Sequence, residues 1–169
     1  MDTPKAFITL DGRTLLHYSL RAIASLGTIG EAVVTVPAGM ERRARAEVKC
    51  AGVEIPVKLV AGGAERQDSV RIALGMTSAA SEVVVVHDAA RPFATSALFS
   101  ACIDATQRAD GAIAAIAVAD TLKHAAGGAI TATVARDELW QAQTPQAFRR
   151  EMLVEAHDRA MRERWTATD

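Results

Sequence analysis

The clearest group of potentially reactive side chains follows a run of four valines, Val83–Val86. His87 and Asp88 come directly after this run, and Arg91 lies three residues beyond Asp88. A carboxylate in this position can bind a hydroxyl group or a divalent cation, and an arginine can make bidentate contacts with a phosphate. The alternative is structural, because Asp88 could cap the following turn while Arg91 neutralises its charge. Loops at strand ends carry many binding sites, so we favour a ligand-binding role for both residues.

Two other segments have residue types suited to a nucleotide or a phosphate. Gly62 and Gly63 let the backbone approach a ligand closely, and Asp68 and Ser69 follow near the start of an expected helix. This segment could hold a base or a ribose, or it could be a glycine turn with a side-chain cap. Lys5 follows a proline that restricts the chain, so its ammonium group could face phosphates, although a lone lysine in such a stretch is usually solvated.

The remaining polar positions have simpler explanations when they are taken alone. Arg136 precedes Asp137 and Glu138, which predicts a local salt bridge, and residues 144–146 predict a turn. The histidines lack metal-ligand spacing, and no set of Ser, His and Asp can be assembled from local motifs. The sequence therefore favours neither a zinc enzyme nor a hydrolase.

Short apolar strands alternate with amphipathic helices along most of the chain. The spacing predicts helices over 15–26, 40–48, 68–76, 95–107 and 149–162, and strands over 32–36, 57–60, 83–86 and 112–118. This alternation predicts an α/β fold with an open, mostly parallel twisted sheet that helices cover on both faces. Residues 120–134 predict a β-hairpin, which is rarely stable alone and should pack on the sheet or on a second subunit.

Composition narrows the class of protein further. The 169 residues fit one domain, and the formal charge of −1 with few aromatic residues argues against a nucleic-acid partner. No run approaches the roughly 18 apolar residues of a membrane span, so we expect no membrane association. Cys50 and Cys102 lie far apart and lack Cys-X-X-Cys spacing, which favours a reduced, cytoplasmic setting.

Taken together, five segments of the chain resemble the 2-C-methyl-D-erythritol 4-phosphate cytidylyltransferases in order and spacing. They are Pro4-Lys5, Gly62–Val70, His87–Pro92, Asp120–Lys123 and Leu139–Gln146. The resemblance implies a Rossmann-like nucleotidyltransferase fold spanning residues 1–169. It also implies a homodimer joined through a projecting hairpin arm at residues 121–140. The implied reaction is a Mg²⁺-dependent attack of the methylerythritol phosphate on the α-phosphorus of CTP, with release of pyrophosphate.

The resemblance also implies roles for individual residues. Lys5 matches a lysine that stabilises charge on the triphosphate. The positions that match residues around cytosine and ribose are Gly63, Ser69 and Ala89. The positions that match residues binding the methylerythritol phosphate are Asp88, Arg91, Thr121 and Arg136. Thr121 and Arg136 would reach across from the partner subunit, with Arg136 positioning the attacking phosphate, and Asp88 is also the candidate metal ligand.

The chain departs from the family pattern at both ends. The family begins with a strand and a Gly-rich loop containing an arginine, and it has a late lysine-bearing motif, whereas this sequence includes neither. We therefore expect either a portion of a longer enzyme or a chain with impaired catalysis. Two alternatives stay open, namely a cytidylyltransferase for another polyol phosphate such as ribitol 5-phosphate, and a non-catalytic nucleotide-binding or dimerisation module. A Rossmann dehydrogenase is disfavoured because no Gly-X-Gly-X-X-Gly follows a strand.

Overall fold

The structure, a computed structural model, describes residues 3–167 of the chain. The helices are the 3₁₀ turn η1 (Lys5–Phe7), α1 (Leu15–Ala24), α2 (Glu41–Cys50), α3 (Arg66–Gly75), α4 (Ser96–Ala105) and α5 (Arg150–Glu163). The strands are β1 (Thr9–Leu10), β2 (Arg13–Thr14), β3 (Ala32–Val36), β4 (Val57–Ala61), β5 (Val83–Val86), β6 (Gly111–Ala117), β7 (Leu122–Ala126), β8 (Ala129–Val134) and β9 (Trp140–Arg149). The predicted alternation of strands and helices is confirmed, and the short pair β1–β2 is an addition to it.

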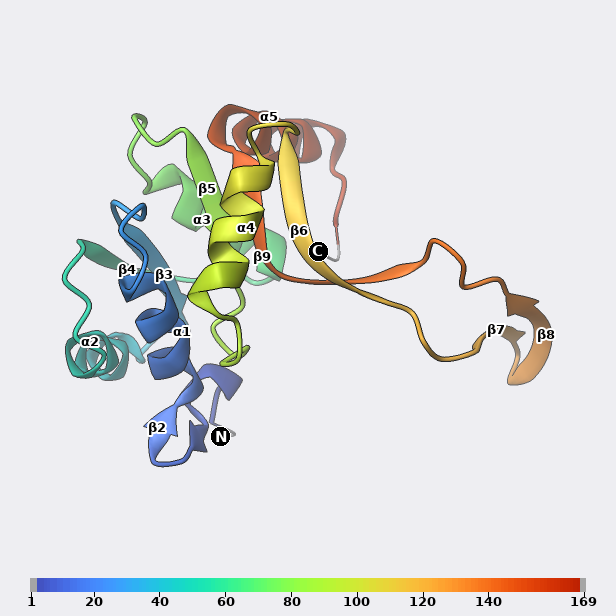
Figure 1. The fold of residues 1–169 in the computed structure, drawn as a ribbon, viewed down its shortest axis with the longest axis horizontal. Coiled ribbons are helices and arrows are strands. Elements are labelled where there is room, and N and C mark those ends of the chain that lie inside the picture. Colours follow the sequence, from blue (N-terminus) through green and yellow to red (C-terminus); the bar gives the residue numbers. More distant parts are fainter. Residues whose placement is uncertain (1–2, 168–169) are drawn as a thin grey trace.

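The strands that form the body pair in two groups. β3 and β4 are parallel, whereas β9 lies between β5 and β6 and runs antiparallel to both. β5 and β6 therefore run in the same direction, as the βαβ pattern predicts. Helices cover both faces, with α1 and α4 in front of the strands and α3 and α5 behind them in Figure 1. The α/β class is confirmed, and the three-stranded group β5–β9–β6 contains an antiparallel central strand that the periodicity did not reveal.

Residues 144–146, predicted to form a turn, lie inside β9 instead. That prediction was wrong because it rested on Pro145, which cannot donate a backbone hydrogen bond in a sheet. In β9 the missing donor falls where the pairing with β6 is irregular, between the pairs Ile113 with Gln146 and Ala115 with Ala142. The pairing with β5 also ends at Gln146. A proline is tolerated in this central strand because neither neighbour needs its N–H.

Two apolar clusters form the core. The first joins η1, α1, β3 and α2 through Phe7, Leu16, Leu20, Val36 and Ala44, all of which are buried. The second joins α4, β6 and β9 through the buried Cys102, Ala114 and Ala147. Burial of this kind stabilises the fold by roughly 25 cal/mol per Å² of apolar surface. The helices are thereby fixed against the strands whose ends carry the candidate residues.

The strands β7 and β8 form an antiparallel hairpin, as predicted, which we call the arm. Gly127 and Gly128 make its turn with φ of 58° and 81°, a conformation that favours glycine. In Figure 1 the arm extends away from the sheet instead of packing on it. Packing on a second subunit therefore stays a prediction.

The observed helix ends follow from their caps. The Thr95 side chain accepts a hydrogen bond from the Leu98 backbone and caps the start of α4. The helix expected over 68–76 begins earlier, at Arg66, because Glu65 and Asp68 form a reciprocal capping box. Within residues 3–167, no helix has the length and apolarity needed to cross a membrane.

Candidate active site

The candidate site is built where the loops after β4 and β5 meet. The β4 loop leads into α3, whose first residue is Arg66, and the β5 loop carries Asp88. Nε of Arg66 donates to Oδ1 of Asp88 at 3.2 Å and joins the two loops. Both loops follow the carboxyl ends of strands, the usual place for ligands in α/β sheets.

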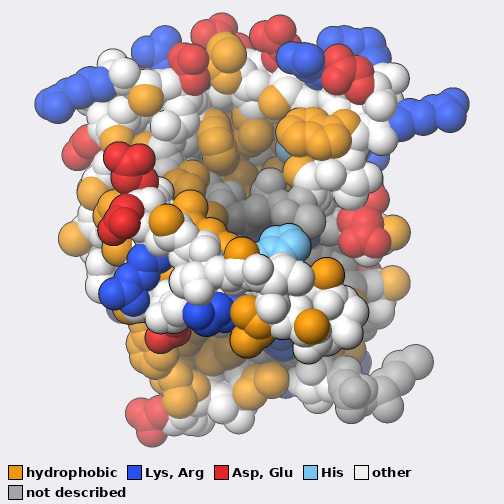
Figure 2. All heavy atoms as spheres, turned by 90° about the vertical axis from the view of Figure 1, so that its right-hand side faces the viewer, with side chains coloured by type: hydrophobic (Ala, Val, Ile, Leu, Met, Phe, Trp, Pro, Cys, Tyr) orange, Lys and Arg blue, Asp and Glu red, His pale blue; other side chains and the backbone are white. Residues whose placement is uncertain are grey.

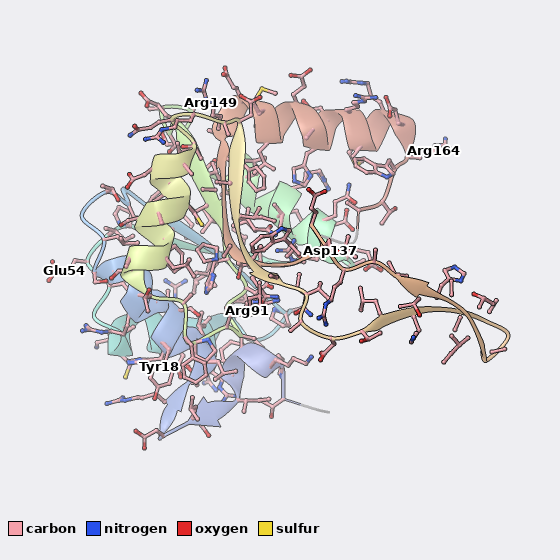
Figure 3. The ribbon with its side chains drawn as sticks, turned by 45° about the vertical axis from the view of Figure 1, so that its right-hand side comes forward. Tyr18, Glu54, Arg91, Asp137, Arg149 and Arg164 are labelled. Carbon is pink, nitrogen blue, oxygen red and sulfur yellow. The ribbon has the colours of Figure 1, made fainter. Side chains whose placement is uncertain are left out.

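The Asp88 carboxylate lies between two guanidinium groups. Arg66 contacts Oδ1, and Nε of Arg91 donates to Oδ2 at 3.1 Å. Nη1 of Arg91 also donates to Oε1 of Gln143, on β9. Guanidinium groups make bidentate hydrogen bonds to phosphate and carboxylate groups, so the cluster suits an anionic ligand. Arg91 lies at the end of the central strands from which the arm leaves the body (Figure 3).

The backbone of Asp88 is held by a polar pair beneath it. The Asp88 N–H donates to Oγ1 of Thr144 at 3.2 Å, and Nδ1 of His87 lies 2.9 Å from the same oxygen. The Thr144 hydroxyl can then donate its single hydrogen to His87, which requires a neutral ring protonated at Nε2. Burial lowers the pKa of His87, against the opposing effect of the Asp88 carboxylate. The ring also packs on Phe99, with centroids 4.9 Å apart, so His87 supports the loop from inside.

The glycine turn before α3 is tightly closed. The Gly63 N–H donates to Oγ of Ser69 at 3.0 Å, and the same hydroxyl donates to the Glu65 carbonyl at 3.2 Å. A Cβ at Gly63 would lie 2.2 Å from Cβ of Asp68, so only glycine fits. The predicted capping role of Asp68 is confirmed by its capping box with Glu65. The alternative role of this turn, holding a base or ribose, stays a prediction.

Lys5 and Ala89 belong to elements that rest on one core cluster. Lys5 opens η1, whose Phe7 is buried in the first cluster, and Ala89 packs against that cluster. Oγ of Ser19 in α1 donates to the Ala89 carbonyl at 3.1 Å and anchors the β5 loop. The structure therefore places the Lys5 turn and the β5 loop on a common support.

Thr121 and Arg136 lie at the root of the arm, one before β7 and the other after β8. The predicted salt bridge of Arg136 with Asp137 or Glu138 was wrong for residues 3–167. Nη1 of Arg136 donates instead to the Ala119 carbonyl on the opposite side of the arm. A backbone carbonyl competes well here because both neighbouring acids are exposed and solvated. Thr121 and Arg136 are both exposed, and their contact with a second subunit stays a prediction.

Three residues of this site were not identified from the sequence as functional candidates. Arg66 and Gln143 contact the Asp88 and Arg91 side chains, and Thr144 holds the Asp88 backbone. All three lie inside the motifs that carry the family resemblance, which was the available signal. Sequence spacing does not show which way a side chain points from a helix start or a strand.

The expected metal site does not match the residues found. Both oxygens of Asp88, the candidate ligand, accept hydrogen bonds from arginines. Across residues 3–167, no group of three or more His, Cys, Asp or Glu side chains could hold a metal ion. A hard cation such as Mg²⁺ prefers carboxylates that are not already neutralised. We therefore assign no metal ligand among these residues.

A cavity of about 230 Å³ lies behind the site, between α3, β9 and α5. Its walls are mostly apolar, including Val70, Phe148 and Leu153, and Arg66 is among the residues that line it. His157 also lines it, and burial, followed by the charge of Arg71, lowers its pKa. Figure 2 looks toward the face from which the arm projects, where hydrophobic side chains lie along part of the rim of a hollow.

Comparison with known proteins gives one consistent result. The family described as "IspD: 2-C-methyl-D-erythritol 4-phosphate cytidylyltransferase" matches residues 1–169. A curated relative of that description from Deinococcus radiodurans is 43% identical over 166 residues, covering 98% of this chain and 66% of the relative. A "Bifunctional enzyme IspD/IspF" from Anaeromyxobacter dehalogenans is 43% identical over 169 residues, covering 98% of this chain and 43% of the relative. The chain thus spans less than half to about two thirds of these relatives' length.

Solved structures agree with the sequence relatives. The 4-diphosphocytidyl-2C-methyl-D-erythritol synthase of Anaerococcus prevotii superposes with a TM-score of 0.89 at 25% identity, covering 98% of this chain and 73% of that one. The 2-C-methyl-D-erythritol 4-phosphate cytidylyltransferase of Thermus thermophilus superposes with a TM-score of 0.82 at 37% identity, covering 98% and 75%. The arrangement of strands, helices and arm described above is therefore shared with these proteins.

Proposed function

Since the chain belongs to the 2-C-methyl-D-erythritol 4-phosphate cytidylyltransferase family, we propose that the protein transfers CMP from CTP to 2-C-methyl-D-erythritol 4-phosphate. The reaction would serve isoprenoid precursor synthesis. The observation that carries the proposal is the cluster of Arg66, Asp88 and Arg91. This cluster lies at the end of β5, beside the glycine turn, and presents guanidinium groups to an anion. An anionic acceptor and an anionic triphosphate repel one another, so a transfer enzyme needs positive groups placed beforehand.

The proposed step exchanges one phosphorus–oxygen bond for another. A phosphate oxygen of the acceptor bonds to the α-phosphorus of CTP, and the bond from that phosphorus to the bridging oxygen of the β-phosphate breaks. Pyrophosphate leaves with the electron pair. A phosphate monoester loses its second proton near pH 6, so the nucleophile is ionised at neutral pH and needs no general base. The protein's contribution is alignment and charge neutralisation.

On the acceptor side, Arg91 would bind the phosphate of the methylerythritol phosphate, beside Asp88. The partner subunit's Thr121 and the partner subunit's Arg136 would complete this pocket, with the arginine orienting the attacking oxygen. The exposed position of both residues at the root of the arm supports the proposal, since a neighbour could reach them.

On the nucleotide side, Lys5 would stabilise the negative charge of the triphosphate. Gly63, Ser69 and Ala89 would surround cytosine and ribose. Support comes from the exposed glycine turn, where Gly62 and Gly63 let a ligand approach the backbone closely. Mg²⁺ accompanying CTP would be held by the nucleotide's own phosphates and by water, because the described residues offer it no carboxylate cluster.

The proposed homodimer forms through residues 121–140, which comprise the arm and its root. The arm and its root expose large apolar side chains, with Ile130 68% exposed and Trp140 64% exposed. An isolated two-stranded hairpin is marginally stable, and apolar surface of this kind usually marks an interface. A second copy of the chain covering the arm would remove this surface from water. Cys50 and Cys102 are free thiols, in keeping with the reducing cytoplasm proposed for the enzyme.

The test is a pyrophosphate-release assay on the full-length protein. It uses CTP and Mg²⁺ with either methylerythritol phosphate or ribitol 5-phosphate as the acceptor. We expect release with methylerythritol phosphate alone. Release only with ribitol 5-phosphate would assign the other acceptor, and CTP binding without release from either would indicate a non-catalytic module.

The role of Arg136 is tested by Arg136→Ala in the same assay. We expect turnover to fall by about 10²–10³-fold, the usual effect of removing one transition-state donor, while the Kd for CTP changes little. Arg159→Ala is the matched control, because Arg159 is an exposed residue that pairs with Glu163 on α5. Comparable losses of CTP affinity and turnover in Arg136→Ala would contradict the assignment.

A further inference from the structure

Asp88 has two cationic neighbours that are held in different ways. Arg91 lies on the loop after β5, whereas Arg66 is the first residue of helix α3. Each uses its Nε to reach a different oxygen of the same carboxylate, at 3.1 Å and 3.2 Å. The carboxylate is therefore a bridge between a residue on a helix and a residue on a loop.

The helix end of this bridge is fixed by several hydrogen bonds. Asp68 accepts from the Glu65 N–H at 3.4 Å as part of the capping box, which sets the first turn of α3. Next to Arg66, the side chain of Gln67 donates to the Trp165 carbonyl at 3.3 Å and accepts from the Ala167 N–H at 2.8 Å. The turn that carries Arg66 is thus anchored both to its own helix and to the segment after α5.

At the loop end of the bridge, the strength with which Asp88 holds the Arg91 guanidinium depends on Arg66. With Arg66 present, Asp88 is shared between two cations. Without Arg66, the Asp88 carboxylate would draw the Arg91 guanidinium more strongly. A phosphate would then compete for Arg91 with a carboxylate that is no longer shared with Arg66.

We propose that Arg66 is a positioning residue that, through Asp88, keeps Arg91 oriented and electrostatically available for the phosphate of the acceptor. This inference rests on the proposed function and adds to it a residue that does not itself contact the reacting atoms. Arg66 is suited to this role because its side chain is only 31% exposed and lines the cavity behind the site. Its effect should fall on the acceptor and not on CTP.

The test compares steady-state kinetics of Arg66→Met, Arg66→Lys and Arg71→Met in the full-length enzyme. Arg66→Met keeps the length of the side chain but loses the charge, and we expect the KM for methylerythritol phosphate to rise about 10- to 100-fold, the usual loss for a hydrogen bond to a charged group. The KM for CTP should change by less than about twofold. Arg66→Lys restores the charge but lacks the planar guanidinium with its several N–H donors, so it should reverse part of the rise in acceptor KM. Arg71→Met removes an exposed charge from the same helix and should behave like wild type.

Two results would overturn the inference. An unchanged acceptor KM in Arg66→Met would show that Arg91 does not depend on the bridge. Equal increases in both KM values, in Arg66→Met and in Arg66→Lys, would indicate damage to the α3 turn instead. If Arg66→Met fails to fold, the comparison of Arg66→Lys with Arg71→Met decides, since a selective rise in acceptor KM is still required.

A separate measurement distinguishes this inference from the proposed function. Absence of turnover in wild type with every acceptor would refute the proposed function. The bridge is then judged from the ¹⁵N signal of the Arg91 Nε–H, assigned with Arg91→Lys. Faster hydrogen exchange of that group in Arg66→Met supports the positioning contact, and an unchanged rate refutes it.

Discussion

Replacing Gly63 by alanine tests whether the turn before α3 is as closed as its geometry indicates. The added Cβ would lie 2.2 Å from Cβ of Asp68, 3.1 Å from the Asp68 carbonyl carbon and 3.2 Å from the Ser69 nitrogen. Non-bonded carbon atoms prefer separations of about 3.5–4.0 Å, so the turn must open by more than about 1 Å. The contacts are with backbone and Cβ atoms, which cannot swing aside as a long side chain can.

The magnitude follows from two effects. Overpacking of this kind costs about 1–3 kcal/mol. Opening the turn also weakens the 3.0 Å hydrogen bond from the Gly63 N–H to Ser69, which is worth about 1 kcal/mol. The free energy of unfolding should fall by about 2–4 kcal/mol, which lowers Tm by about 4–16 °C in a chain of this size. If the turn surrounds the nucleotide, the Kd for CTP should rise as well.

The assay is thermal unfolding followed by circular dichroism, together with calorimetric titration of CTP. Gly75→Ala is the matched control, because it lies at the other end of α3 and its Cβ would meet no atom of residues 3–167 within 4 Å. That control should keep or slightly raise Tm, since alanine is favoured over glycine in helices by about 1 kcal/mol. A Tm for Gly63→Ala within about 1 °C of wild type would refute the steric argument. A lower Tm with unchanged CTP affinity would refute only the nucleotide role.

Two further predictions concern pH and assembly. Burial lowers the pKa of His87 and of His157, so below about pH 6.5 the unfolded chain binds more protons than the folded one, and the free energy of unfolding should fall as pH decreases. In urea titrations across pH 5–8, His87→Gln and His157→Gln should each flatten this dependence, and an unchanged slope in both variants would contradict the assignment. For assembly, Ile130→Glu on the arm should shift the mass measured by light scattering from dimer to monomer at micromolar concentration. The control Met161→Glu, at a residue 56% exposed on α5, should leave the dimer intact, and a dimeric Ile130→Glu would refute the arm interface.

The regular elements could be predicted where the sequence pattern is strong. Val83–Val86 is a run of four β-branched residues, which is typical of a strand, and the apolar spacing around Phe99 is typical of a helix; both were found at the expected place. The ends of elements depended on caps that are visible only when particular side chains fold back. The start of α3 at Arg66 is an example, because the Glu65–Asp68 pair extended the helix beyond its apolar pattern.

The candidate site was predictable in its backbone and less so in its side-chain contacts. The loops that carry Gly63 and Asp88 were identified because glycines and acids after strands are typical of ligand sites. The bridge from Arg66 to Asp88 was not identified. These residues are 22 positions apart, and their contact depends on the direction in which the Arg66 side chain points. Roles that depend on a second subunit, such as that of Arg136, follow only from the family resemblance.

Strand β9 contains the segment 144–146 that was wrongly predicted to be a turn. It also supplies Gln143 and Thr144, whose contacts with the site the sequence did not reveal. Its buried residues include Thr144 and Gln146, only 4% and 6% exposed, which is unusual for polar side chains inside a sheet. Thr144 is needed there because the Asp88 N–H, at the end of β5, has left the ladder and finds its acceptor in the hydroxyl group. A polar strand beside a functional loop supplies the hydrogen bonds that a fully apolar strand could not. The same polarity removes the alternation by which strands are recognised, so the segment that supports the site is the one that periodicity is least able to predict.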